Sequence, residues 1–259
     1  MKKMTKKPFY ISIICCLLIK TGLNGAELTL KLPPPNPIAQ PLQYLQYYPP
    51  HYWNGLQKTL DWKSNAPLFV AGAILIPMSF LGDQPLQENV AKHNFLPENI
   101  SRIGYIYGHR WGNYAAAVTV GINGVIQHQP WNKTFSQIEL LATSTITTAL
   151  VTEAIKLATH RERPNEENYK SFPSGHSSNS FALAAGLDGI YGHKIGIPAY
   201  LMAIFVASTR INDNKHYLSD VVAGAFIGTW IGKSFSRQYQ LEWQISATGS
   251  PAISITIPF

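Results

Sequence analysis

The sequence predicts an all-α protein, a bundle of about six helices followed by a short C-terminal β-hairpin. Two observations lead to this prediction. Apolar segments rich in Ala, Leu and Ile recur along the chain with helical character, and Gly or Pro separates them. From residue 241 onward, apolar and other residues alternate instead, which is typical of strands. A length of 259 residues is enough for one sizeable domain with small appendages.

The first 25 residues have the layout of a secretory signal peptide. Lysines at positions 2, 3, 6 and 7 precede an apolar stretch at 9–19, and small residues follow at Gly25 and Ala26. Removal of residues 1–25 leaves 16 basic and 14 acidic residues, so the net charge falls from +7 to +2. We therefore expect an exported protein and no nucleic-acid partner. An uncleaved membrane anchor is the alternative.

Both cysteines of the chain, Cys15 and Cys16, lie inside this predicted signal. The mature chain would contain no cysteine, so we expect neither a disulfide nor a thiolate metal site. Residues 26–55 form a proline-rich N-terminal segment, for which we expect irregular or polyproline-like structure over 31–50.

The helical domain is expected at residues 56–237. Two of its stretches without Asp, Glu, Lys or Arg, 64–82 and 111–132, are long enough to cross a membrane. Hydropathy leaves a soluble, a peripheral and a membrane-spanning bundle open. The six segments with helical character are 66–81, 113–127, 138–159, 178–191, 197–209 and 219–235.

The C-terminal extension, residues 238–259, is expected to form the hairpin. Leu241, Trp243 and Ile245 alternate with other residues, the sequence ATGSP suits a turn, and a second alternating run ends at Phe259. We expect this hairpin to pack on the bundle or on a neighbouring subunit.

Several polar residues lie within or between the apolar segments. Lys156 and Arg163 are seven residues apart, so they would share a face of a helix over 138–162, which Pro164 should end. Ser174, in the sequence Pro-Ser-Gly-His that ends at His176, is a good N-cap for the next helix. The free N–H groups of such a helix start attract anions, and a histidine beside them can transfer a proton.

A third group of polar residues follows the fifth apolar segment. His216 and Asp220 are four residues apart, so on a helix the carboxylate could accept a hydrogen bond from one ring nitrogen and leave the other nucleophilic. Arg210 precedes them. Each of these features alone is common as a cap, a surface charge or a solvated pair. Together, three cations, a helix start and two histidines suit a bound phosphoryl group.

These residues resemble the three-part signature of the type 2 phosphatidic acid phosphatase superfamily, which includes bacterial class A acid phosphatases, lipid phosphate phosphatases and vanadium haloperoxidases. The resemblance spans residues 156–220, about a quarter of the chain. The family usually has Ser before the arginine of the third part, whereas this chain has Thr209, which keeps a hydroxyl. The gap between Pro164 and Pro173 is short and leaves little room for a loop over the substrate.

The resemblance implies an active site between the helices, with His216 attacking phosphorus to form a phosphohistidine and Asp220 supporting it. His176 would protonate the leaving oxygen and then activate water. It implies no metal and no cofactor. The residues implied to hold the phosphate oxygens are Lys156, Arg163, Ser174, Gly175 and Arg210.

The function implied by the resemblance is a metal-independent phosphatase that acts on a phosphate monoester or pyrophosphate. We expect a lipid substrate, such as undecaprenyl pyrophosphate, phosphatidylglycerol phosphate or a lipid A phosphate, at the periplasmic side of a bacterial cell envelope. The alternatives are a soluble periplasmic acid phosphatase, a vanadate-dependent haloperoxidase, and a catalytically silent phospholipid-binding protein. The sequence predicts no oligomeric state.

Overall fold

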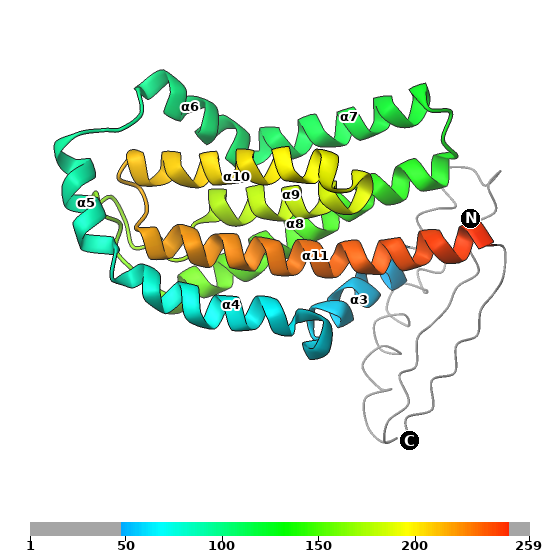
Figure 1. Ribbon diagram of the computed structural model, residues 1–259, viewed down its shortest axis with the longest axis horizontal. Coiled ribbons are helices and arrows are strands. Elements are labelled where there is room, and N and C mark those ends of the chain that lie inside the picture. Colours follow the sequence, from blue (N-terminus) through cyan, green and yellow to red (C-terminus); the bar gives the residue numbers. More distant parts are fainter. Residues whose placement is uncertain (1–47, 249–259) are drawn as a thin grey trace, which may run out of the picture. The chain divides into compact units, whose positions relative to one another are not determined.

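The computed structural model describes residues 48–248, and every regular element in that range is helical (Figure 1). The predicted all-α class is therefore confirmed. The elements are α3 (Tyr48–Thr59), α4 (Trp62–Phe80), α5 (Asp83–Lys92), α6 (Glu98–Ile106), one π-helical turn η2 (Tyr107–Trp111), α7 (Gly112–Ile126), α8 (Trp131–Thr159), α9 (Gly175–Tyr191), α10 (His193–Asn212) and α11 (Leu218–Thr248).

Each of the six apolar segments predicted from the sequence coincides with a helix, in chain order α4, α7, α8, α9, α10 and α11. The short helices α3, α5 and α6 were not predicted. Helix α5, with the sequence DQPLQENVAK, is too polar to show an apolar period. Helix α3 begins with Tyr48 followed by two prolines, which fit the first turn of a helix because their missing N–H groups need no partner there. Residues 48–50 are therefore helical, not polyproline-like.

The prediction of a C-terminal β-hairpin is wrong for its first strand, because residues 241–248 continue helix α11. An alternation of three apolar residues is a short signal, and no Gly or Pro interrupts the chain between Gly232 and Gly249. Extending an existing helix by one residue costs far less than starting a new element. The second predicted strand, like the predicted signal peptide and most of the proline-rich segment, lies outside the described residues.

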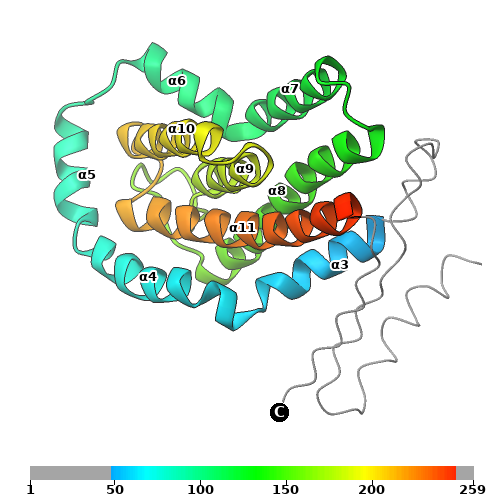
Figure 2. The ribbon, with the colours of Figure 1, turned by 45° about the vertical axis from the view of Figure 1, so that its right-hand side comes forward.

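Helix α9 occupies the centre of the bundle and packs against α8, α10 and α11 (Figures 1 and 2). Glycines on one face of α11 allow its close approach to α9. A Cβ atom on Gly224 would come within 2.6 Å of the Ser174 carbonyl oxygen, and one on Gly232 within 2.8 Å of the Ala182 carbonyl oxygen. Gly228, between them, approaches the backbone of α9 as closely. This contact fixes the start of α9 beside the start of α11.

The apolar core lies between the same helices. Leu140 of α8 packs with Ile231 and Phe235 of α11, and all three are buried. Leu183 of α9 packs with Leu141 of α8 and Val120 of α7. The core therefore holds α8, α9 and α11 together.

Two helices among the described residues, α8 and α10, are long and apolar enough to cross a membrane. The bent pair of α4 and α5, with an angle of 54° between its halves, passes the same criterion as one broken span. Of the two stretches singled out in the sequence, 64–82 thus belongs to this bent pair. The other, 111–132, contains α7, which with 15 residues is too short for a span.

Candidate active site

Four helix ends, the end of α8, the start of α9, the end of α10 and the start of α11, meet near α5 (Figures 1 and 2). The backbone N–H of Ser174, just before α9, donates to the carbonyl oxygen of Asp220 in α11 at 2.9 Å. Lys156, near the end of α8, donates from Nζ to the carbonyl oxygen of Pro173 at 2.7 Å and to that of Lys170 at 2.9 Å. These bonds join the first part of the predicted signature, through Lys156, to the second, and the second to the third through Asp220.

Helix α8 ends earlier than predicted, at Thr159. His160 takes a left-handed conformation with φ 44° and ψ 42°, and its N–H closes the last turn by donating to the Lys156 carbonyl oxygen. Arg163 therefore lies in the loop 160–174 and not on the helix face that carries Lys156, which corrects the prediction of a helix over 138–162. The loop folds back on itself, since the N–H of Arg163 donates to the carbonyl oxygen of Asn168 at 3.0 Å.

Ser174 caps helix α9 as the sequence predicts. Its hydroxyl oxygen accepts a bond from the N–H of Ser177 at 3.5 Å, and the side chain is fully buried. Gly175 is the first residue of α9, and a Cβ there would meet only the Lys156 side chain, at 3.9 Å. Lys156 thus approaches the N-terminus of α9, where free N–H groups and the helix dipole favour an anion.

His216 and Asp220 are adjacent in space, although they do not share a helix. His216 lies in the loop between α10 and α11, and Asp220 lies in the first turn of α11. Nδ1 of His216 is 3.5 Å from Oδ2 of Asp220, and both side chains are buried. At this length the contact is not a hydrogen bond, and Nδ1 has no hydrogen-bond partner among the described residues. The pairing was predicted correctly, while the helix that was expected to produce it begins only at Leu218.

Arg210 occupies the last turn of α10 and is 3% exposed. Its Nη2 pairs with Oδ2 of Asp213 at 2.5 Å, and its Nε is 3.3 Å from the hydroxyl oxygen of Thr209. The hydroxyl of Thr209, which stands where the family usually has Ser, therefore contacts the arginine. The guanidinium carbon also lies 5.4 Å from the centre of the Tyr105 ring.

His176, the second residue of α9, stacks on the same tyrosine, with 5.2 Å between the ring of Tyr105 and its own. Arg210 and His176 thus contact the same aromatic ring. Nε2 of His176 and Nε of Arg163 are buried and have no hydrogen-bond partner among the residues that the structure describes. Buried donors without partners are rare in folded proteins, so both atoms are available for a ligand.

The two histidines are held neutral by their surroundings. Burial, together with the charges of Arg210, His216, His109 and Arg163, lowers the pKa of His176 to about 3. The pKa of His216 is lowered to about 4, because burial and the charge of Lys156 outweigh the opposing effect of Asp220. Both rings are therefore within reach of the cations predicted to hold phosphate.

The sequence interpretation missed several residues of this region. Arg161 bonds to Asp220, and Asp83 of α5 bonds to Arg161. Ser171 donates to Asp220 as well. A small hollow that opens to solvent lies against His216 on the side of α5, and Asp83, Gln87 and Tyr217 are among the residues that line it. Arg161 was visible in the sequence as a third basic residue in the run HRERP, but nothing local pointed to Asp83.

Among residues 48–248 no group of three or more His, Cys, Asp or Glu side chains is close enough together to hold a metal ion.

Comparison with known proteins identifies a matching domain. Residues 138–244 match the model of the PAP2 superfamily. All eight residues predicted for the site fall in this range. No solved structure matches the chain at a significant level.

Three curated proteins are similar to parts of the chain. Lipid A 1-phosphatase of Porphyromonas gingivalis is 36% identical over 76 residues, which cover 28% of this chain and 17% of that protein. Lipid phosphate phosphatase 1 of Arabidopsis thaliana is 33% identical over 134 residues, covering 36% of this chain and 41% of the relative. Probable lipid phosphate phosphatase 4 of the same plant is 33% identical over 150 residues, covering 41% and 48%. The chain thus spans less than half the length of each relative.

Proposed function

We propose that this chain, which carries a PAP2 superfamily domain at residues 138–244, hydrolyses a phosphate ester or pyrophosphate of a lipid through a phosphohistidine on His216. The observation that carries the proposal is the environment of His216. It is buried and neutral, it is paired with Asp220 through Nδ1, and positively charged side chains lie near it. A neutral imidazole with a proton on Nδ1 has a lone pair on Nε2, which is the atom that attacks phosphorus.

Binding of the substrate phosphate is assigned to Lys156, Arg163 and Arg210, together with the N-terminus of α9. The buried Nε of Arg163 has no partner among the described residues, and an anion would supply one. One proton of the Lys156 ammonium remains after its two bonds to backbone carbonyls. These cations neutralise charge on the equatorial oxygens as phosphorus is transferred.

The first step forms the bond between Nε2 of His216 and phosphorus and breaks the bond from phosphorus to the leaving oxygen. The leaving oxygen takes a proton from His176. In the free protein the pKa of His176 is about 3, so the ring is neutral. A bound phosphate beside it favours the imidazolium and raises this pKa, so that substrate binding itself creates the acid.

The second step returns the enzyme to its starting state. Water attacks phosphorus, neutral His176 accepts a proton from that water, and the bond from phosphorus to Nε2 breaks. Inorganic phosphate leaves, His216 is neutral again, and His176 releases its proton to solvent as its pKa falls back to the value of the free protein. Asp220 balances the positive charge that His216 carries while it is phosphorylated.

A lipid substrate is supported by two independent observations. The curated relatives are named for lipid phosphates or lipid A. Large apolar side chains are exposed along α4, α7 and α10, at more than half of their surface for Met78, Val118 and Leu201. Such faces suit contact with acyl chains. We place the protein in the cell envelope with the site facing the periplasm, following the predicted signal peptide.

The test is a phosphate-release assay of the purified protein, with and without detergent, on undecaprenyl pyrophosphate, phosphatidylglycerol phosphate, a lipid A phosphate and soluble phosphate esters. We expect release from at least one lipid, activity that persists in EDTA, and inhibition by vanadate. His216→Ala should abolish release while inorganic phosphate still binds. A strict metal requirement, or full activity of His216→Ala, would refute the proposal. Equal activity on soluble esters without detergent would favour the soluble acid phosphatase instead.

A further inference from the structure

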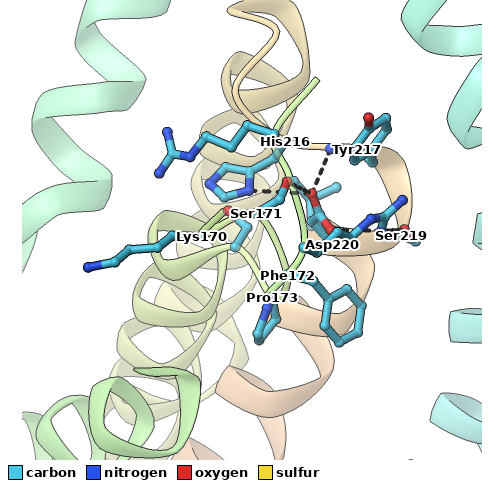
Figure 3. A network of polar contacts seen from close by, with 12 residues as sticks. Lys170, Ser171, Phe172, Pro173, His216, Tyr217, Ser219 and Asp220 are labelled. Carbon is cyan, nitrogen blue, oxygen red and sulfur yellow. Dashed lines mark hydrogen bonds and ion pairs between the residues drawn. The ribbon is translucent and has the colours of Figure 1, made fainter. Parts of the chain in front are cut away.

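A chain of buried polar contacts links helix α5 to His216 through Arg161 and Asp220. Figure 3 shows Asp220 between the imidazole of His216 and Ser219. Nη1 of Arg161 donates to Oδ1 of Asp220 at 2.9 Å, and Nη2 donates to Oδ2 of Asp83 at 2.7 Å. One guanidinium therefore bridges two carboxylates whose side chains are 0% and 7% exposed.

Asp83 also fixes the start of α11, which carries Asp220. Its Oδ1 accepts a bond from the N–H of Ser219 at 2.8 Å, and its Oδ2 accepts one from the Ser219 hydroxyl at 2.7 Å. A carboxylate at the first turn of a helix satisfies free N–H groups and is favoured by the helix dipole. Asp83 thus acts as a cap for α11, although it belongs to a helix more than a hundred residues earlier in the chain.

Aromatic rings hold the guanidinium between these carboxylates. The Arg161 carbon Cζ lies 4.2 Å from the centre of the Tyr217 ring and 5.1 Å from that of Phe80. The guanidinium is planar, so aromatic rings can cover its faces while the N–H groups at its edge donate to the two carboxylates. A lysine ammonium does not provide this geometry.

The orientation of the Asp220 carboxylate matters because its contact with His216 is long. Oδ2 of Asp220 accepts a bond from the N–H of Tyr217 at 2.8 Å and one from Ser171, while Nδ1 of His216 is at 3.5 Å. Arg161 holds the other oxygen. A rotation of this carboxylate would remove the support that it gives to His216.

The charges in this chain of contacts depend on one another. Without Arg161, two buried carboxylates would repel, and one of them would take up a proton. Without Asp83, the charge of Arg161 would act on Asp220 alone and would weaken the attraction of Asp220 for a phosphorylated His216. We propose that Asp83 and Arg161 are positioning residues for the phosphoryl transfer at His216. This inference rests on the proposed function, and it assigns a role to a residue outside the PAP2 match at 138–244.

The decisive substitution is Asp83→Asn, which keeps the shape and the acceptor for Ser219 but removes the charge. We expect kcat to fall on the order of 10-fold to 100-fold, the range found when a partner that orients an active-site ligand is lost. The Kd of inorganic phosphate should stay within about twofold, because the cations that hold the anion are unchanged. We express kcat per phosphate-binding site, counted by isothermal titration calorimetry, so that a smaller folded fraction does not lower it.

The matched control is Glu88→Gln, which makes the same charge change on the exposed side of α5 and should leave kcat unchanged. The role of Arg161 is tested by a double-mutant cycle with Arg161→Gln. If Asp83 acts through Arg161, Asp83→Asn should change kcat by less than about twofold in the Arg161→Gln background. If the Arg161→Gln protein does not fold, Arg161→Lys provides the second background.

The possible outcomes separate this inference from the proposed function. A wild-type protein without His216-dependent activity would refute the proposed function itself. An active wild-type protein with Asp83→Asn equal to wild type in kcat per site would overturn only the positioning role. The positioning role would also be overturned if Asp83→Asn lowered kcat equally with Arg161 present and in the Arg161→Gln background, because Asp83 would then act independently of Arg161.

Discussion

Acidification from pH 7 to pH 5 is expected to destabilise the folded protein, because two histidines are buried in their neutral form. The pKa of His176 is about 3 and that of His216 about 4 in the folded chain, against 6.5 for an unperturbed histidine. Between these values the unfolded chain binds more protons than the folded one. Stability is therefore complete above about pH 6.5 and is lost as the pH falls below it.

The size of the effect follows from the distance between the pH and the unfolded pKa. A pH of 5 lies 1.5 units below the pKa of 6.5 of a histidine in the unfolded chain, and each unit corresponds to about 1.4 kcal/mol. Each of the two buried rings therefore lowers the free energy of unfolding by about 2 kcal/mol at pH 5. Together they lower the free energy of unfolding by about 4 kcal/mol, a large part of the stability of an ordinary domain. Burial alone would raise the pKa of Asp220, but its contacts with His216 and Ser171 lower the pKa below 3.8. Asp220 therefore does not change the free energy of unfolding between pH 7 and pH 5.

The assay compares the wild type with a His176→Asn, His216→Asn double variant. Each protein is unfolded with a chemical denaturant in a mild detergent at pH 7, 6 and 5, and unfolding is monitored by circular dichroism. The double variant should lose about 4 kcal/mol less than the wild type between pH 7 and pH 5. Other titratable groups contribute equally to the pH dependence of both proteins, so their contribution cancels in this difference. Equal pH dependence of the two proteins would show that the histidines are not buried as neutral rings, and the account of their chemistry would fail.

Two further predictions concern packing and phosphate binding. Gly228→Ala should lower the free energy of unfolding by about 1–3 kcal/mol, since a Cβ would collide with the Ser178 carbonyl oxygen. Gly121→Ala is the control and should not destabilise the protein, because nothing lies within 4 Å of its Cβ. Thermal unfolding of both variants measures this, and equal effects would contradict the tight contact of α9 with α11. Arg163→Ala should raise the Kd of inorganic phosphate about 10-fold or more in calorimetric titration, because a charge-assisted bond is lost, while Arg102→Ala on the exposed side of α6 should leave it unchanged. Unchanged binding by Arg163→Ala would remove that arginine from the site.

The parts of this protein that the sequence predicts are those that depend on neighbouring residues. Long apolar runs rich in Ala, Leu and Ile located α8, α9 and α10, because each run covers several turns and ends at a recognisable cap or loop. Ser174 was predicted as an N-cap from four residues of sequence, and it is one. Arg163 was misplaced, because the left-handed turn at His160 ended the helix before the proline did.

The parts that the sequence does not predict depend on distant contacts. Asp83 reaches Arg161 and Ser219 only because α5 folds over the start of α11, and a single aspartate in a polar helix carries no local sign of that. The alternation at residues 241–245 predicted a strand, but the long helix that precedes it determined the structure. The spacing of His216 and Asp220 suggested one helix face, whereas the pair forms across a helix start.

The most direct test of the central claim is chemical capture of the intermediate. His176→Asn lacks the group that protonates the leaving oxygen and that activates water. With an aryl phosphate such as p-nitrophenyl phosphate, whose leaving oxygen departs without a proton, only the second step is blocked, so the variant should accumulate a phosphorylated enzyme. A quench in alkali, in which the nitrogen–phosphorus bond survives, followed by mass spectrometry of the peptide that contains residue 216, should find one phosphoryl group on His216. A phosphoryl group on any other side chain, or turnover by a protein with His216→Asn, would contradict the account.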